Sequence, residues 1–215
     1  TRRSPIQLSV DDGAGGDGRG SVGHRPAALA DYAVVVGDGQ LIERPNGDLV
    51  PVWDYPAEES NGPIINGLPE IPQECPAGPP GGSGWRYDPD FRFDETVRWK
   101  LFLSFGDIVD GTSNTIFAGE KHVSISHFGK RRFLDNSTYN PDQLLTFGRF
   151  AGPGFGLARY PEEEPLDNFG SYHPSICQFV FGDNSVRSLA TFIDTEVLGF
   201  LATRFGGEVT DPQSY

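Results

Sequence analysis

Glycine and proline interrupt this chain so often that a long helix or a long strand has no room to form. The sequence holds 28 glycines and 18 prolines among its 215 residues. Glycine weakens the interior of a helix or strand, and proline removes a backbone donor from either. This composition favours many short strands joined by long loops. We therefore expect one mainly β domain of the α+β class over residues 1–215, built on an antiparallel sheet.

The most clearly marked element is a β-hairpin within Asn168–Ile193. Gln178–Gly182 alternates polar and apolar side chains, which predicts a strand with Phe179 and Phe181 on one face. The Asp-Asn pair at 183–184 suits a two-residue turn, because both side chains tolerate positive φ and can bond their own backbone. The chain then returns as a second strand.

The two-residue turn sets the expected register of this hairpin. Ser185–Ile193 forms the second strand, in which Val186 faces Phe181 and Ser188 faces Phe179. Each pair then places a smaller side chain opposite a large one across the ladder.

A short C-terminal helix is expected after the hairpin. Asp194 is a suitable N-cap, and Glu196 lies in the first turn, where a carboxylate complements the exposed amides. The apolar face of the helix consists of Val197, Leu198, Leu201 and Phe205. Arg204 lies in the last turn, and Gly206-Gly207 ends the helix. We expect the apolar face to dock onto the sheet, so that residues 168–215 form one C-terminal unit.

The other predicted strands are short and lie between turns. They cover Asp31–Val36, Gln40–Glu43, Arg98–Phe105, Thr115–Glu120 and Phe147–Phe150. The strand at 40–43 could return from the Gly-Asp-Gly turn that ends the first. Residues 45–84 form an irregular insertion, because nine prolines exclude a central strand or helix of any length. This insertion is either an interaction surface or a plain loop, with Trp53 and Tyr55 as its expected anchors.

Three ordered segments resemble the signature of one bacterial family. Ile108–His122, IVDGTSNTIFAGEKH, is similar to its DGTSNT-x-x-x-GEK signature, and Thr146–Gly154, TFGRFAGPG, to the segment before its hairpin. His173 and Asp183 resemble its closing H-x9-DG motif. On these motifs the chain is identified as a member of the prepilin-like proteins of domain-of-unknown-function family 1559. The matching motif residues are Gly111, Thr112, Ser113, Glu120, Lys121, His173, Asp183 and Asn184, the last of which replaces the glycine of the motif.

The resemblance implies a pilin-like head domain with a structural role. Family members carry an N-terminal pilin helix, which is absent here, since this sequence has no apolar run of about 18 residues. We expect a non-enzymatic pilin- or pseudopilin-like subunit of an extracellular or cell-surface assembly, on the periplasmic side or outside of a bacterial envelope. Its partners would be other copies of itself or other subunits. It would meet a membrane only through an N-terminal helix.

The charge of the chain argues against one class of partner. Lys and Arg total 17 against 30 Asp and Glu, which gives a net charge of −13. Nucleic-acid binding needs a basic surface that neutralises phosphates, so we expect no nucleic-acid partner. An acidic surface suits a secreted protein. The acidic run at 162–164, between two prolines, is interpreted as a solvated loop.

The sequence gives little support for enzyme chemistry. The histidines His24, His122, His127 and His173 lack the spacing of zinc hydrolases, and no G-x-S-x-G motif is present. His173 could approach Asp183 across the base of the hairpin, and we expect it to bond Asp183 or the backbone. The alternative function is a surface-displayed module that binds glycans or solutes through aromatic residues, for which the candidates are Trp53, Tyr55, Trp85 and Tyr87.

No cofactor is expected, with one alternative left open. Asp107, Asp110 and Asn114 share a polar turn, which makes them the best candidates for a Ca²⁺ ligand set. The simpler interpretation is that Asp110 and Asn114 bond backbone amides and fix the turn.

The two cysteines also leave two interpretations. Cys75 and Cys177 are the only cysteines in the sequence. In a secreted protein they could form a disulfide that ties the Pro-rich insertion to the hairpin strand. The alternative is that Cys177 faces the core as a buried thiol and Cys75 lies in a loop.

Overall fold

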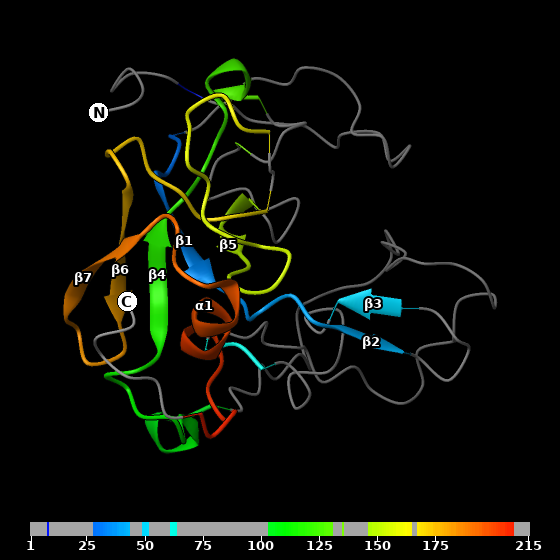
Figure 1. Ribbon diagram of the computed structural model, residues 1–215, viewed down its shortest axis with the longest axis vertical. Coiled ribbons are helices and arrows are strands. Elements are labelled where there is room, and N and C mark those ends of the chain that lie inside the picture. The colour runs from blue at the N-terminus through cyan, green and yellow to red at the C-terminus, as the bar shows by residue number, and fades with distance from the viewer. Residues whose placement is uncertain are drawn as a thin grey trace, which may run out of the picture.

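The structure is a computed structural model of the chain (Figure 1). It describes residues 8, 28–43, 49–51, 61–63, 103–130, 135, 146–164 and 167–208. Most of the Pro-rich insertion lies outside the described residues. The same holds for five residues singled out from the sequence, namely Trp53, Tyr55, Cys75, Trp85 and Tyr87. What we expect of those residues stays a prediction.

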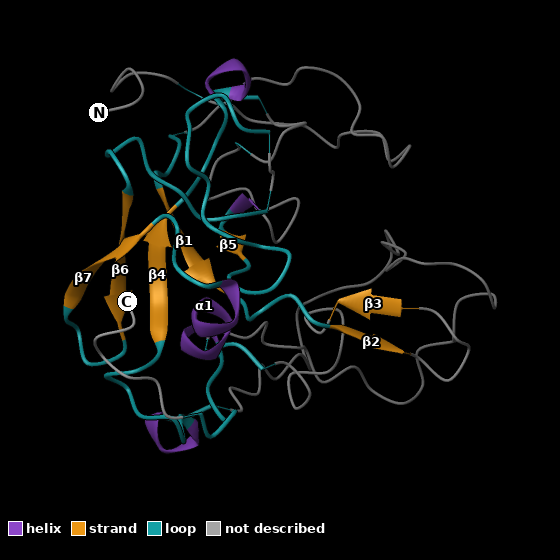
Figure 2. Cartoon of the chain, viewed as in Figure 1, coloured by secondary structure: helices purple, strands orange, loops and turns teal. Residues whose placement is uncertain are grey.

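A five-stranded sheet forms the centre of the fold (Figure 2). In spatial order it consists of β5 (Gly148–Arg149), β1 (Tyr32–Val35), β4 (Ile116–Glu120), β6 (Ile176–Phe181) and β7 (Val186–Ala190). Neighbouring strands are antiparallel except β1 and β5, which are parallel. The mainly β, α+β prediction is confirmed, but the sheet is mixed rather than antiparallel. Residues 36–147 separate β1 from β5, which is ample length for the crossover that a parallel pairing needs.

The hairpin of β6 and β7 has the predicted buried face and a different register. Phe179 and Phe181 are both buried, as the alternation predicts. Val186, however, pairs with Val180 instead of Phe181, so the predicted register is wrong by one residue. The reason is that the turn contains three residues, 182–184, instead of two.

The turn closes around Asn184. Its amide donates to the carbonyl oxygen of Phe181 at 2.9 Å, and its φ of 67° lies in the left-handed region. The Asp183 carboxylate accepts a hydrogen bond from the Ser185 amide at 2.9 Å. A left-handed residue that follows a type I turn is typical of three-residue hairpin loops. An Asp-Asn pair suits this loop as well as the shorter one, which is why the sequence alone did not decide between them.

The core lies between the sheet and helix α1 (Thr195–Ala202). The helix packs on the sheet, and in Figure 1 it lies beside the lower part of β4 and below β1. Asp194 caps it as predicted, since its carboxylate accepts from the Glu196 amide at 2.7 Å. The predicted docking of the helix is confirmed by a shared core, which includes Val35, Ile116, Phe169, Phe179, Phe181, Leu189, Leu198 and Leu201. Burial of these apolar side chains is the main favourable contribution to folding.

The end of α1 differs from the prediction. The helix stops at Ala202, so Arg204 and Phe205 lie beyond it, and Phe205 is 48% exposed instead of part of the apolar face. Arg204 is buried, and it donates from its amide to the carbonyl oxygen of Asn61 at 3.0 Å and from its guanidinium to that of Gly62 at 2.8 Å. These contacts with a distant segment stabilise an extended chain where the sequence predicts another helical turn.

The remaining elements lie around the main sheet. β2 (Leu41–Glu43) and β3 (Leu49–Pro51) pair with each other in a separate two-stranded sheet, so β2 does not return along β1. Two 3₁₀ helices, η2 (Phe105–Asp107) and η3 (Ile125–His127), lie at opposite ends of the molecule, at the bottom and the top of Figure 1. None of the helices in the described part of the chain is long and apolar enough to cross a membrane.

Candidate functional site

The tip of the hairpin is bonded to the DGTSNT loop. The Gly182 amide donates to the carbonyl oxygen of Thr115 at 2.9 Å, and the Asp183 amide donates to that of Thr112 at 3.0 Å. Within the loop, Gly111 has a φ of 87° and Ser113 is exposed in a turn. Two of the segments that carry the family resemblance therefore meet through backbone hydrogen bonds.

The Asp183 carboxylate acts within the hairpin itself. It accepts from the Ser185 amide, and it forms an ion pair with Arg187 at 3.3 Å. The hydrogen bonds from Ser185, with a smaller contribution from the Arg187 charge, lower the pKa of Asp183 below its ordinary value. The ionised carboxylate is thus the form that stabilises the turn.

His173 contacts Glu120 and not Asp183. Its Nε2 lies 3.5 Å from one carboxylate oxygen of Glu120, whose other oxygen accepts from the Gln178 amide at 2.8 Å. The expected contact between His173 and Asp183 is wrong, because the two residues flank opposite ends of β6, a six-residue strand about 20 Å long. The histidine of one motif and the glutamate of another instead meet where the pairing of β4 and β6 ends.

Lys121, the neighbour of Glu120, is completely buried. Its Nζ lies 3.2 Å from the Oδ1 of Asp135 and donates to the carbonyl oxygen of Thr146 at 3.2 Å. The exposed fraction of both the Lys121 and the Asp135 side chains is 0%. The other oxygen of Asp135 accepts from the Gly129 amide at 2.6 Å. Sequence reasoning missed this pair, since nothing local connects a strand residue with an aspartate in a later loop.

The third motif segment packs against the end of β1. The Val36 amide donates to the carbonyl oxygen of Arg149 at 3.0 Å, and the Ala151 amide donates to that of Gly37 at 3.1 Å. A Cβ on Gly152 would approach the backbone of Asp38, which explains the glycine there. All three motif segments therefore contribute to the contacts that hold the main sheet and its loops together.

The candidate calcium ligands bond two different backbone segments. Asp107 accepts from the amide and the hydroxyl of Ser104 at 2.6 and 2.8 Å, and these hydrogen bonds lower the pKa of Asp107. Asp110 accepts from the amides at 206 and 207 at 2.9 and 2.7 Å. The Asn114 side-chain amide donates to the carbonyl oxygen of Asp110 at 3.0 Å.

This geometry favours the interpretation in which the polar turn fixes the backbone. The Asp110 carboxylate joins the loop before β4 to the segment that follows α1. Across the described residues, no group of three or more His, Cys, Asp or Glu side chains is arranged to hold a metal ion.

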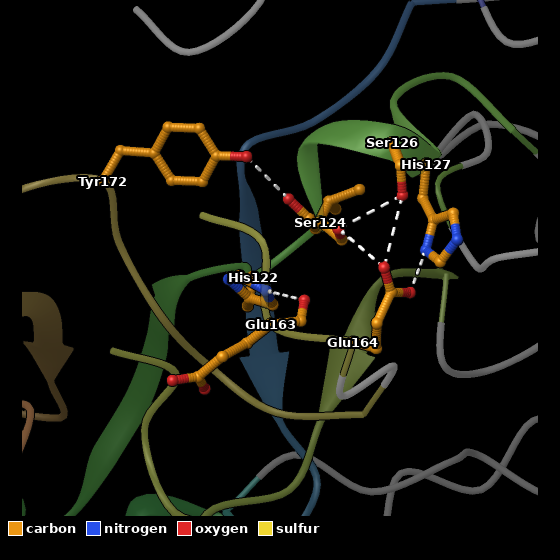
Figure 3. Close-up of polar contacts among 8 residues, drawn as sticks. His122, Ser124, Ser126, His127, Glu163, Glu164 and Tyr172 are labelled. Carbon is orange, nitrogen blue, oxygen red and sulfur yellow. Dashed lines mark hydrogen bonds and ion pairs between the residues drawn. The ribbon is translucent and has the colours of Figure 1, made fainter. Parts of the chain in front are cut away.

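A second polar cluster gathers around Glu164 (Figure 3). One carboxylate oxygen accepts from the hydroxyls of Ser124 and Ser126 at 3.2 and 3.3 Å, and the other lies 3.1 Å from Nδ1 of His127. Nearby, the buried His122 bonds the carbonyl oxygen of Glu163 at 2.9 Å through Nε2. The Glu164 side chain is 61% exposed, in keeping with the interpretation of this acidic run as a solvated loop, and it makes these contacts in addition.

Comparison with known proteins places the chain in a family. Residues 72–196 match the family described as a protein of unknown function (DUF1559). This match covers more than half of the chain. The chain belongs to the DUF1559 family. The matched range contains the DGTSNT loop, the GEK residues and the H-x9-D hairpin. No curated protein and no solved structure matches the chain.

In the polar clusters of this DUF1559 protein, one carboxylate bonds groups from two separate segments of the chain; we call such a carboxylate a clamp. In a nucleophilic triad the imidazole lies between the hydroxyl and the carboxylate. Around Glu164 the carboxylate lies between the hydroxyls and the imidazole, so it bonds all three side chains and holds the loop at 161–164 to the segment after β4. The arrangement joins two backbone segments through side-chain contacts.

Cys177 is buried on the core side of β6. Its Sγ lies 3.8 Å from the carbonyl oxygen of Glu120. Cys177 therefore faces the core, as in the interpretation that treats it as a buried thiol. Whether Cys177 pairs with Cys75 stays a prediction, because Cys75 lies outside the described residues.

Proposed function

We propose that this DUF1559 protein is a non-enzymatic, pilin-like structural subunit of a cell-surface assembly. The observation that carries the proposal is what the motif side chains bond. Glu120, Asp183 and Asp110 each direct carboxylate oxygens at backbone amides of this same chain. Side chains used in this way fix the conformation of the surface loops. A fixed surface is what contacts between subunits of an assembly require.

Contacts between copies would form most readily where apolar side chains replace carboxylates at the surface. The chain carries a net charge of −13, so two heads repel each other over most of their surface. At the end of the molecule that holds η2, three apolar side chains, Phe105, Val109 and Phe205, are exposed by 69%, 71% and 48%. We call these three residues the end patch.

The end patch is held together by the polar turn. The Asp110 amide donates to the carbonyl oxygen of Arg204, and its carboxylate accepts from the amides at 206 and 207. Val109 and Phe205 each adjoin these bonded residues, so the two apolar side chains lie on connected segments. Figure 1 shows η2 beside the segment that follows α1. The carboxylates of Asp107 and Asp110 beside the patch accept hydrogen bonds from backbone amides of the chain, and the exposed apolar side chains would provide the contact with a second copy.

Sedimentation velocity of the full-length protein tests the proposal. We expect self-association that Val109→Asp weakens at least tenfold, because the substitution places a charge in the contact. Ile125→Asp is the matched control, since Ile125 is 56% exposed in η3 at the opposite end of the molecule. A protein that stays monomeric at high concentration and binds a glycan instead would overturn the proposal in favour of a displayed binding module.

A further inference from the structure

We propose that Lys121 and Asp135 become joined by an intramolecular isopeptide bond between their side chains. The Lys121 Nζ lies 3.2 Å from Oδ1 of Asp135, and neither side chain is exposed to solvent. By comparison, the side chains of the Asp183–Arg187 ion pair are each 32% exposed. The inference concerns the chemistry of this site and does not depend on the proposed function.

Two backbone groups orient the pair for bond formation. The Gly129 amide donates to Oδ2 of Asp135 at 2.6 Å, while Oδ1 lies 3.2 Å from the amine. The carbonyl oxygen of Thr146 accepts from Nζ at 3.2 Å and fixes the position of the amine. When nitrogen attacks the carboxyl carbon, negative charge develops on the oxygens, and a backbone amide that already points at Oδ2 stabilises that charge.

The reaction balances with no other reactant. The Lys121 ammonium carries three protons on its nitrogen, and the Asp135 carboxylate carries two oxygens on its carbon. A bond forms between Nζ and Cγ, and the bond between Cγ and Oδ1 breaks. Oδ1 leaves with two of the three protons as one water molecule, while the third proton stays on the amide nitrogen. No electrons are transferred, so neither an oxidant nor a reductant is required.

Complete burial favours the amide over the ion pair. Two charges removed from water carry a large desolvation penalty, and their mutual attraction offsets it only in part. Condensation converts both charges into one neutral amide, which is far less costly to bury. Proximity inside a packed interior also makes the reaction intramolecular, which accelerates it strongly. The product would link the end of β4 covalently to Asp135, which lies between β4 and β5 in the sequence.

Intact mass spectrometry of the folded protein, denatured just before measurement, tests the inference. We expect the chain to be lighter than its sequence mass by one water molecule. Loss of water also occurs at Asp-Gly pairs such as Asp38-Gly39, so the site is located by trypsin digestion. A cross-linked protein resists cleavage after Lys121 and yields residues 101–130 joined to residues 133–149.

Three variants separate the cross-link from other losses of mass. Lys121→Arg and Asp135→Ala remove one reacting group each, and we expect both to keep their full sequence mass. Asp135→Asn retains a reactive carbonyl group and should lose one ammonia, which gives the same final mass as the cross-linked native chain. A native chain at its full sequence mass that releases residues 101–121 as a free peptide would overturn the inference. Because the native chain alone decides, poor folding of a variant does not obscure the result.

Discussion

Asn184 shows how one residue fixes the geometry of the hairpin. Its φ of 67° is a conformation that most side chains avoid, and it occurs where the H-x9-DG motif has glycine. Asparagine adopts this left-handed conformation more readily than other residues apart from glycine. The substitution that distinguishes this chain from the motif therefore keeps the turn, and the asparagine is explained by backbone conformation.

Replacement of Asn184 should reveal the cost of that conformation. Asn184→Ala is expected to lower the free energy of unfolding by about 1 kcal/mol, because alanine disfavours the left-handed region. Asn184→Gly should leave the free energy unchanged or raise it slightly. Urea denaturation at neutral pH measures both values. Equal losses in the two variants would show that the side chain of Asn184, and not its φ, is what matters.

Asp183 should make stability depend on pH in the acidic range. Its pKa is lowered from 3.8 by hydrogen bonds from Ser185, so the folded state favours the ionised carboxylate. The stabilising contribution is complete above 3.8 and is lost as the pH falls through the lower folded-state pKa. Asp183→Asn keeps an acceptor for the Ser185 amide but cannot ionise. Urea denaturation from about pH 5 to about pH 2 should show a shallower loss of stability in this variant than in the native protein. Parallel curves would contradict the role of the carboxylate.

At the scale of elements, Glu120 holds the end of β4 to the start of β6. Glu120→Ala leaves the Gln178 amide without its 2.8 Å acceptor and should lower the free energy of unfolding. The expected loss is about 1–3 kcal/mol. Glu120→Gln, which keeps an acceptor, should cost less. His173→Ala is the matched test of the other partner: the His173 side chain is 58% exposed, so a loss below about 1 kcal/mol is expected. A larger loss for His173→Ala than for Glu120→Ala in denaturant titrations would reverse this assignment.

Gly119 allows β4 to approach the aromatic core. A Cβ added at this position would meet the rings of Phe179 and Phe169. Gly119→Ala should therefore lower the free energy of unfolding by about 1–3 kcal/mol through overpacking. Gly106→Ala is the control, because the nearest atom to its added Cβ is the Ser104 Oγ at 3.4 Å, in an exposed position. Thermal denaturation of both variants checks the difference, and similar melting temperatures would contradict the packing argument.

Local patterns in the sequence predicted the type and the buried face of an element better than they predicted which residues it pairs with. The buried face of β6 and the Asp194 cap were predictable because alternation and capping depend on neighbouring residues. The hairpin register was not predictable, because an Asp-Asn pair suits loops of two and of three residues. The end of α1 was not predictable, because it depends on a competing interaction. For α1 that interaction is the bonding of Arg204 to the distant residues 61 and 62.

The candidate site shows the same division. The motif segments were visible in the sequence, but the partners of their side chains were not. Glu120 bonds Gln178, Lys121 lies against Asp135, and Glu164 bonds serines some 40 positions earlier. Contacts of this separation follow from the path of the whole chain. The parallel pairing of β1 and β5 also depends on that path and not on the residues of either strand.

At the scale of the whole molecule, an acidic protein exposes apolar side chains at the end that holds η2. The net charge of −13 opposes association over most of the surface, while Phe105, Val109 and Phe205 of the end patch expose apolar side chains for the proposed contact. A structural subunit needs both properties, since it must remain dispersed until it meets its assembly and must then bind in one orientation. The clamps at Glu120, Asp110 and Glu164 hold the loops of the head in a defined shape.

Electron cryo-microscopy of the protein isolated from its native cells tests the proposed structural role most directly. The account predicts an ordered assembly of repeated heads, in which the side chains of Phe105, Val109 and Phe205 are buried against a neighbouring subunit. Isolated single heads whose end patch faces solvent would contradict it.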